Sequence, residues 1–140
     1  MKVALFGGTG FVGSYIVDEL ISQGIEPNLM VREDSEDKLL QQEMCRVIKG
    51  DIDDEKAINE TLDGCSAVIY SIGIIREFPN RGITYENTHF NGAKRCIDAA
   101  KKKGISRFIL MSANGAKMNG TGYQSTKFNS EEYLKFSDLD

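Results

Sequence analysis

The sequence of 140 residues is short of three things: cysteines in binding patterns, positive charge and long apolar stretches. Its three cysteines form no C-x-x-C pair and have no metal-ligand spacing, which excludes the common metal-binding and disulfide-exchange motifs. We therefore expect Cys45, Cys65 and Cys96 to be reduced thiols of the core, and we expect no metal site.

The charge balance excludes a further class of partners. Lysine and arginine number 17 against 21 acids, a net charge of -4, so no basic excess is present to bind nucleic acid. No apolar run approaches the roughly 20 residues that a membrane-spanning helix needs. Met1 and Lys2 lead directly into a strand-like run without a signal-peptide pattern. These absences predict a cytoplasmic protein without a transmembrane segment.

Apolar, strand-like runs alternate with helical patterns along the whole chain. The strands are expected at residues 2–6, 26–31, 45–50, 66–73 and 106–112. The helical patterns lie at residues 11–24, 35–42, 53–64, 84–103 and 123–136. Such alternation predicts right-handed βαβ units, and hence an α/β fold of three layers with helices on both faces of a doubly wound parallel sheet.

The last helical pattern is followed by no sixth strand, although a doubly wound sheet normally has one. We therefore expect residues 1–140 to form a single domain at the N-terminal end of a longer chain. The fifth strand would then be an open edge, and such an edge is a place where a second copy or a larger complex can pack.

Glycines are concentrated between the first strand and the first helix, in "LFGGTGFVG". Gly7, Gly10 and Gly13 satisfy G-x-x-G-x-x-G, and Gly8, Gly10 and Gly13 satisfy G-x-G-x-x-G. The first glycine allows a tight turn, Gly10 lets backbone amides approach a pyrophosphate at the helix N-terminus, and Gly13 allows close packing of the helix on the sheet. Because the pattern lies between a strand and a helix, it predicts a Rossmann-type dinucleotide site.

The end of the second strand bears on which dinucleotide is bound. Sites for NAD usually place an acid about 20 residues after the glycines, whereas an arginine accommodates the 2′-phosphate of NADP. Arg32 comes first in this chain and is followed by Glu33 and Asp34. Arg32 favours NADP, while the two acids keep NAD open.

The ends of the third and fourth strands are expected to complete the cofactor site. Asp51 lies just after the third strand, where a carboxylate can accept a hydrogen bond from the adenine amino group. It could instead cap the next helix, a task that Asp53 or Asp54 can perform equally well. The end of the fourth strand should form a wall beside the cofactor, made of Ser71, Ile72 and Gly73.

A tyrosine and a lysine stand four residues apart in the last helical pattern. Tyr123 and Lys127 therefore share one face of that helix. An ammonium group favours the phenolate of a nearby tyrosine, so the pair can relay a proton during hydride transfer, and the lysine can also hold the nicotinamide ribose. Together with the glycine loop, this spacing predicts catalysis by Tyr123 and Lys127.

The chain resembles the short-chain dehydrogenase/reductases, in their extended or atypical branch. The resemblance rests on "LFGGTGFVG", on Gly50-Asp51, on "RFILMSANGA" and on "YQSTK", which occur in the family's order. "GIIRE", "GITYENTHFNGAKRCIDAAKKKG" and "YQSTKFNSEEYLK" look like bacterial relatives of the NAD(P)-binding accessory subunit of respiratory complex I. Those relatives are commonly described as nucleoside-diphosphate-sugar epimerases or epimerase/dehydratases.

The resemblance implies a role for each matching position. It implies that Thr9, Phe11 and Val12 supply backbone around the pyrophosphate, between the three glycines. Asp51, with Ile52 beside it, matches the adenine contact, and Tyr123 with Lys127 matches the catalytic pair.

Three features depart from the family pattern. Ser112 falls one residue before the catalytic serine or threonine position, which Ala113 occupies. His89 replaces an asparagine usual three residues before a glycine, here Gly92, and a lone histidine is more often a packing or capping residue. The family's later strand and its small substrate domain are missing from residues 1–140.

Two functions follow as hypotheses. The first is an NAD(P)-dependent oxidoreductase or sugar-nucleotide epimerase, with an unknown small-molecule substrate, Tyr123 as acid/base and Lys127 and Ser112 beside it. The second is a non-catalytic NAD(P)-binding module for redox sensing or for assembly of a larger complex.

Overall fold

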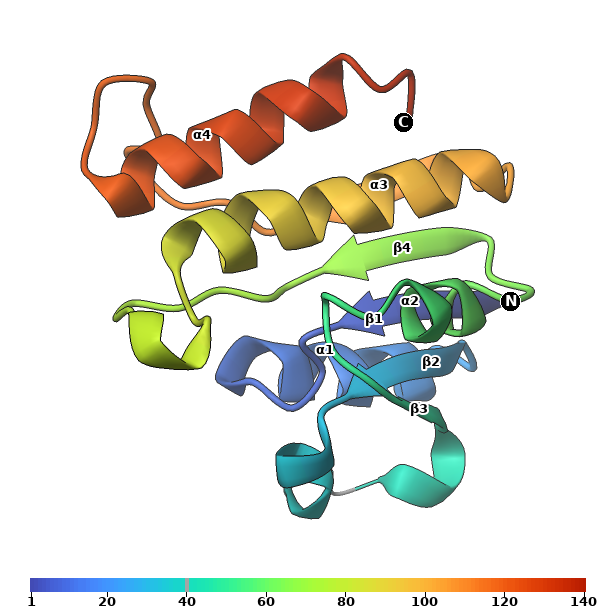
Figure 1. Ribbon diagram of the computed structural model, residues 1–140. Helices are drawn as coiled ribbons and strands as arrows, with labels where there is room; N and C mark the ends of the chain where they lie inside the picture. Colours follow the sequence, from blue (N-terminus) through green and yellow to red (C-terminus); the bar gives the residue numbers. More distant parts are fainter. Residues whose placement is uncertain (40) are drawn as a thin grey trace.

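Five parallel strands form one sheet in the computed structural model, which describes residues 1–39 and 41–140. The strands lie in the order β3-β2-β1-β4-β5 and all run in one direction (Figure 1). Their bounds are Lys2–Phe6 (β1), Glu26–Val31 (β2), Arg46–Lys49 (β3), Ala67–Tyr70 (β4) and Arg107–Leu110 (β5). The predicted doubly wound sheet is confirmed.

The apolar runs become strands because the sheet is covered on both faces and can bury every side chain of its centre. β1 is the central strand and is fully buried from Val3 to Phe6. Phe6 is paired with Met30 of β2 on one side and with Tyr70 of β4 on the other. The carboxyl ends of β1, β2 and β4 therefore meet at one edge, where α/β sheets bind their ligands.

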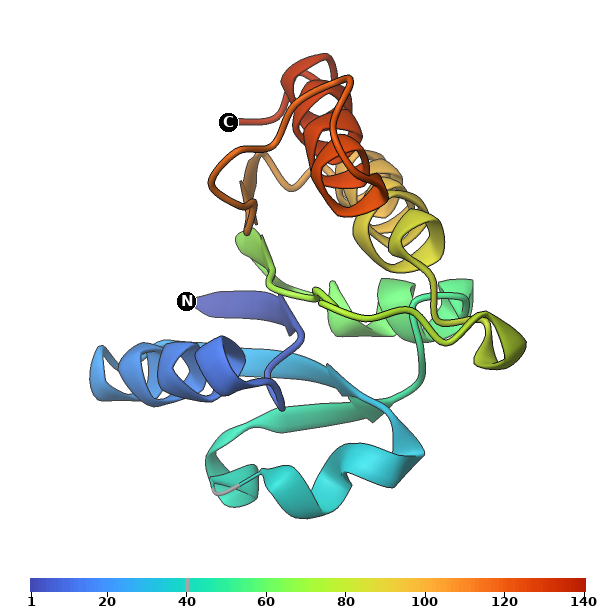
Figure 2. The same ribbon diagram turned by 90° about the vertical axis from the view of Figure 1, so that its left-hand side faces the viewer.

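The helices are unevenly divided between the two faces of the sheet. Their bounds are Phe11–Ser22 (α1), Glu55–Thr61 (α2), Gly92–Lys102 (α3) and Gly122–Lys135 (α4). Figure 2 shows α1 on one face and α2 with α3 on the other, α4 lying beyond α3. The core on the α1 face is the smaller one and includes Leu5 and Leu29, whereas the opposite core includes Phe6 and Ile97 and extends to side chains of α4.

The connection from β2 to β3 has no α-helix among its described residues. Two 3₁₀ segments, Glu33–Lys38 (η1) and Gln42–Met44 (η2), stand where a helix is predicted over residues 35–42. Position 40 of that prediction lies outside the described residues. Five of the six residues of η1 are charged, which leaves little apolar surface to hold a helix against the sheet.

The predicted helix over residues 84–103 is interrupted at its beginning. Residues Glu86–Asn91 (η4) form a π-helical turn, and α3 follows from Gly92. The hydroxyl of Tyr70 donates to the Thr88 carbonyl oxygen over 2.7 Å, and a β-carbon at Gly92 would lie 2.4 Å from that hydroxyl oxygen. The buried tyrosine thus occupies space against the helix and offers one of its carbonyls a partner, which favours a local change of pitch.

The outer edge of β5 is paired at one point. The amide of Phe108 donates to the Asp140 carbonyl oxygen over 2.8 Å, and the amide of Asp140 donates to Ser106 over 2.7 Å. This is the pattern of a parallel bridge. Asp140 therefore lies alongside β5, although the described residues after α4 form no sixth strand.

Candidate functional site

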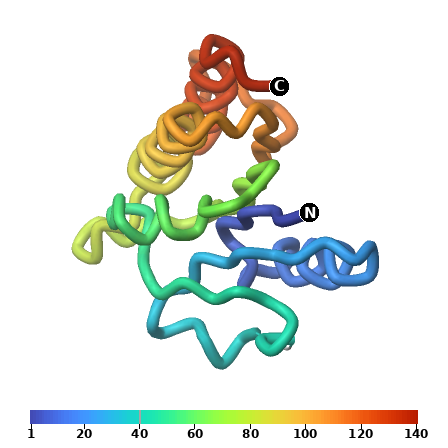
Figure 3. Tube along the Cα trace, turned by 90° about the vertical axis from the view of Figure 1, so that its right-hand side faces the viewer, coloured from blue at the N-terminus to red at the C-terminus, as the bar shows by residue number. Residues whose placement is uncertain are grey.

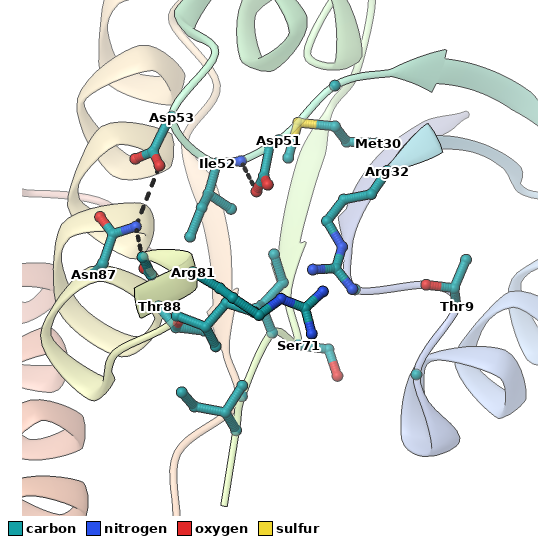
Figure 4. Close-up of a pocket in the computed structure, with 18 residues that line it drawn as sticks. Thr9, Met30, Arg32, Asp51, Ile52, Asp53, Ser71, Arg81, Asn87 and Thr88 are labelled. Carbon is teal, nitrogen blue, oxygen red and sulfur yellow. Dashed lines mark hydrogen bonds between the residues drawn. The ribbon is translucent and has the colours of Figure 1, made fainter. Parts of the chain in front are cut away.

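A cavity of about 260 Å³ opens at the carboxyl edge of the sheet (Figure 4). Nine of the expected cofactor residues line it: Gly7, Thr9, Gly10, Arg32, Asp51, Ile52, Ser71, Ile72 and Gly73. Residues of the segment after β4 and of η4 complete the lining, among them Ile74, Arg81, Gly82, Ile83, Asn87 and Thr88. Figure 3 shows that this segment, near residue 80, projects to the side of the sheet. The cavity thus joins residues from the first and the second half of the fold.

The glycine loop is compressed to a degree that only glycine allows. Gly7 has a φ of 98°, and a β-carbon there would lie 3.0 Å from the nitrogen of Ile72, which lies two residues after β4. A β-carbon at Gly13 would lie 1.9 Å from the Gly7 carbonyl oxygen. Gly13 therefore packs α1 against the turn itself, whereas the sequence predicted close packing on the sheet.

The N-terminus of α1 carries no cap from a side chain, and its first turn contains no acid. The amide of Ser14 makes the first helical hydrogen bond, to the Gly10 carbonyl oxygen over 2.9 Å. The amides of Phe11, Val12 and Gly13 lie ahead of that bond and outside the helical ladder. Amides in this position, together with the helix dipole, favour an anionic group such as a pyrophosphate.

Two arginines extend into the same cavity from opposite sides (Figure 4). Arg32 follows β2, and its Nε lies 3.7 Å from Asp34 Oδ1 in a half-exposed ion pair. A hydrogen bond from the Ser35 hydroxyl, and then the charge of Arg32, lower the pKa of Asp34. Arg81 closes the 3₁₀ segment Pro79–Arg81 (η3). The two guanidinium groups give the cavity a local positive charge despite the acidic chain.

Three aspartates follow β3 and differ in their partners. Asp54 caps α2, since its carboxylate accepts from the amides of Lys56 and Ala57. Asp53 forms an ion pair with Arg95 at 2.9 Å. Asp51 accepts from the Ile52 amide over 2.6 Å and lines the cavity. The alternative that Asp51 caps the helix is therefore wrong.

The end of β4 separates the cavity from the predicted catalytic pair. A β-carbon at Gly73 would lie 3.3 Å from Lys127 Nζ, so the ammonium group is next to the cavity wall. Lys127 is only 4% exposed, and its Nζ donates to the Met111 carbonyl oxygen over 3.0 Å. Burial lowers the pKa of Lys127.

Tyr123 and Lys127 lie on α4, whose start is fixed by a capping box of Thr121 and Gln124. The ring of Tyr123 is packed edge-on against His89, with ring centroids 5.0 Å apart, and against Tyr85 at 5.7 Å. The hydroxyl of Ser112 donates to Glu131 of the same helix. Ser112 is thus near α4, but its hydroxyl is engaged by a carboxylate.

His89 is 1% exposed and is bonded through both ring nitrogens. Its Nε2 accepts from the Ile74 amide over 3.0 Å, and its Nδ1 lies 3.1 Å from Thr126 Oγ1. Burial, and then the charge of Lys127, lower the pKa of His89 to about 4. The histidine is a packed and fully bonded core residue that touches both parts of the site.

Several residues in or beside the cavity were not singled out from the sequence. Arg81 and Asn87 stand between the expected end of β4 and the core of α3, and no local pattern marks them. Tyr85 is also new: its hydroxyl donates to the Ile75 carbonyl oxygen over 2.9 Å, and its ring is stacked on His89. The proline and glycine around Arg81 indicate a turn, but a turn alone does not predict which cavity it faces.

Two expected absences concern other kinds of site. Within residues 1–39 and 41–140, no cluster of His, Cys, Asp or Glu is arranged to hold a metal ion. In the same described part of the chain, no helix has both the length and the apolar character needed to cross a bilayer. Burial raises the pKa of Cys65 to about 11, which disfavours a reactive thiolate there.

A glycine turn at the carboxyl edge of a doubly wound sheet, an uncapped helix N-terminus and a cavity between them define a dinucleotide-binding domain. The chain matches the model of the family described as NAD(P)H-binding over residues 7–140. It belongs to that family, and the predicted place among atypical short-chain dehydrogenase/reductases is confirmed.

Two relatives of this chain are a reductase and a subunit of a respiratory complex. The ceramide reductase of Caulobacter vibrioides is 28% identical over 137 residues, which are 97% of this chain and 42% of that protein. The 40 kDa subunit of the mitochondrial NADH-ubiquinone oxidoreductase of Neurospora crassa is 29% identical over 136 residues, 94% of this chain and 36% of that subunit. The chain thus spans less than half the length of each relative.

A solved structure agrees with the fold along the whole chain. A Bacillus halodurans protein named for an NAD-dependent epimerase/dehydratase is 27% identical and superposes with a TM-score of 0.84. The alignment covers 100% of this chain and 67% of that one.

Proposed function

We propose that this chain is the NADP-binding part of an oxidoreductase or nucleoside-diphosphate-sugar epimerase of the short-chain dehydrogenase/reductase type. The observation that carries the proposal is the contact across Gly73. One side of this residue lines the cavity, and the other leaves only 3.3 Å between a β-carbon position and Lys127 Nζ. A dinucleotide that extends past the carboxyl end of β4 would therefore lie against Gly73, with the ammonium group of Lys127 directly behind that residue.

The residues around the cavity fit such a group. The free amides at the start of α1 suit the pyrophosphate, and the Asp51 carboxylate suits the adenine amino group or a ribose hydroxyl. The bound dinucleotide would supply the hydride acceptor or donor.

Tyr123 is assigned the proton transfer. Its hydroxyl would exchange a proton with the oxygen of a carbinol or carbonyl substrate. Lys127 would hold the ribose of the cofactor, since its Nζ lies beside Gly73 at the cavity wall. Ser112 has no assigned step, because its hydroxyl is bonded to Glu131.

The two arginines favour NADP over NAD. The 2′-phosphate carries about two negative charges and accepts bidentate hydrogen bonds from guanidinium groups. Arg32 lies where the adenosine ribose is expected, and Arg81 faces it across the cavity (Figure 4). Asp34 competes only weakly for Arg32, at 3.7 Å and half exposed.

Cofactor choice is tested by fluorescence titration with NADPH and NADH. NADPH is expected to bind more tightly, and Arg32→Ala and Arg81→Ala are each expected to reduce the difference by about tenfold. The matched control is Arg76→Ala, an exposed arginine of the same segment that does not line the cavity. Equal binding of both nucleotides by the unmodified chain would assign NAD instead.

Catalysis is tested on the unmodified chain and on Tyr123→Phe, with NADPH oxidation followed for a panel of carbonyl compounds and with conversion to the epimer followed for sugar nucleotides in the presence of the oxidised cofactor. The variant is expected to bind NADPH normally and to lose turnover. Tyr133→Phe is the control, because it makes the same chemical change on the same helix at a hydroxyl bonded to Asp98. Unchanged turnover in Tyr123→Phe would remove the assigned role.

A second candidate is a non-catalytic NADP-binding module for redox sensing or assembly. It is favoured by the engaged hydroxyl of Ser112 and by the similarity to the Neurospora crassa subunit. This function predicts tight retention of NADPH with neither cofactor oxidation nor epimer formation from any compound of the panel, and a change of elution volume when the chain is mixed with a partner complex. Substrate-dependent oxidation of NADPH or formation of an epimer would exclude it.

A further inference from the structure

One side chain connects the cofactor cavity with the helix of the predicted catalytic pair. His89 is the single histidine of the chain, and it lies in the π-helical turn η4, buried to 1% exposure. It is bonded to Ile74, which lines the cavity, and to Thr126, the neighbour of Lys127 on α4. The positions joined in this way are 15 and 37 residues from it in the sequence.

The direction of the hydrogen bonds determines the tautomer. Ile74 donates its amide to Nε2, so this nitrogen carries no proton in the neutral ring. The proton then lies on Nδ1, which donates to Thr126 Oγ1, and the threonine hydroxyl donates to the Gly122 carbonyl oxygen over 2.8 Å. Each polar group in this series of three hydrogen bonds has a partner, and the donors lead from the cavity wall through His89 to the start of α4.

The ring of His89 also determines where the ring of Tyr123 lies. It is stacked on Tyr85 with centroids 5.4 Å apart and meets Tyr123 edge-on at 5.0 Å. A protonated imidazole would carry a positive charge next to the buried Lys127 ammonium, so the neutral ring is the one that can be tolerated here. A neutral aromatic ring with two opposed hydrogen-bonding atoms meets all of these contacts at once.

We propose that His89 is a positioning residue that couples the cofactor cavity to the catalytic pair: a nucleotide that moves the cavity wall at Gly73–Ile74 changes the placement of Tyr123 through the imidazole. This inference rests on the proposed dinucleotide function for the occupant of the cavity. It assigns to His89 no proton transfer with the substrate.

The coupling is measured by NMR on the whole chain with ¹⁵N-labelled histidine, since one histidine gives one pair of ring signals. The free protein is expected to show the tautomer protonated at Nδ1. Saturation with NADPH is expected to shift the ring nitrogens of His89 and the ring protons of Tyr123. A tautomer protonated at Nε2 would overturn the linkage already in the free protein.

Three substitutions separate the two arms of the linkage. His89→Phe retains a ring but loses both hydrogen bonds, whereas His89→Gln and His89→Asn place an amide near the position of Nε2 or Nδ1. NADPH affinity is expected to fall about fivefold in His89→Phe and His89→Asn and to be rescued in His89→Gln, which can still accept from Ile74. A merely structural histidine would instead give affinity losses that follow the loss of stability.

The decisive comparison is the NADPH-induced shift of Tyr123. It is expected to disappear in His89→Phe and in Thr126→Val, and to persist in the control Ser125→Ala, whose hydroxyl bonds only within the first turn of α4. An unchanged shift of Tyr123 in His89→Phe would overturn the coupling.

A different result would contradict the proposed function: neither NADPH nor NADH would bind to the unmodified chain. In that case the tautomer and the hydrogen exchange of the Ile74 amide still decide the linkage. Slow exchange that becomes fast in His89→Phe supports it, and equal exchange in both proteins overturns it.

Discussion

The two halves of the candidate site are held together by different kinds of contact. The half formed by β1, α1 and β2 depends on close contact between backbone segments. A β-carbon at Gly13, for example, would lie only 1.9 Å from the Gly7 carbonyl oxygen. The half formed by β4, η4 and α4 depends on hydrogen bonds of the His89 side chain to residues distant in sequence, namely the Ile74 amide and the Thr126 hydroxyl.

The difference concerns how each half can fail. A backbone contact tolerates no added atom, so one methyl group breaks it. A buried polar network tolerates the atoms but depends on charge and protonation, because an unsatisfied or newly charged member is costly. The first half is therefore sensitive to volume and the second to pH and polarity.

The largest loss of stability is expected where an added side chain has no room. Gly13→Ala should lower the free energy of unfolding by about 3 kcal/mol or more, because its β-carbon would overlap a carbonyl oxygen of the backbone. Urea unfolding measures the loss, and NADPH binding should be lost with it. The control Gly24→Ala has a φ of 70° but nothing within 4 Å of its β-carbon, and should cost about 1 kcal/mol. Equal losses in the two variants would contradict the contrast.

The second half should respond to acid. The pKa of His89 is about 4 in the folded chain against 6.5 for an ordinary histidine, so the unfolded chain binds a proton first as the pH falls. The stability is then lost between about pH 6.5 and 4, and the loss amounts to about 3 kcal/mol. Unfolding free energies at pH 7.5 and 4.5 should differ less in His89→Phe than in the unmodified chain. The same pH dependence in both would refute the assignment.

Lys127 is expected to lower the free energy of unfolding and to be kept because it is needed for cofactor binding. Its ammonium group is buried, and its partner is the uncharged Met111 carbonyl. Lys127→Met should therefore raise the free energy of unfolding by about 1 kcal/mol while NADPH binding weakens. Thermal unfolding and NADPH titration measure the two effects. A variant that is less stable and still binds NADPH fully would show that the lysine serves packing alone.

The smallest effect is expected at the rim of the first half. Asp34→Asn releases Arg32 from a half-exposed pair, so NADPH affinity should rise about twofold, with a stability change below about 0.5 kcal/mol. Asp37→Asn removes the same charge from the same 3₁₀ segment without freeing Arg32 and is the matched control. An equal rise in both variants would assign the effect to net charge.

The same division explains what the sequence could predict. Strands β1 and β2 begin and end where their apolar runs do, because a buried run between turn residues has few alternatives. The glycine loop is likewise local. The residue that caps α2 could not be predicted uniquely, because three aspartates precede this helix and only the geometry of the folded chain selects Asp54.

Features that depend on distant partners could not be predicted. The interruption of the helix over residues 84–103 depends on the hydroxyl of Tyr70, and the place of Arg81 depends on how the segment after β4 returns to the cavity. The role of His89 needs Ile74 and Thr126 at once. No periodicity within a short window contains this information, because the contacts join segments that only the fold brings together.

The π-helical turn at Glu86–Asn91 also limits insertions and deletions in this part of the chain. An α-helix turns by about 100° per residue, so deleting one residue here would rotate everything on one side of the cut by that angle. After such a deletion, either His89 could contact Ile74 or Gly92 could contact Tyr70, but the two contacts could not form at the same time. Homologues that keep both contacts should therefore conserve the spacing between these two positions more strictly than the residues between them.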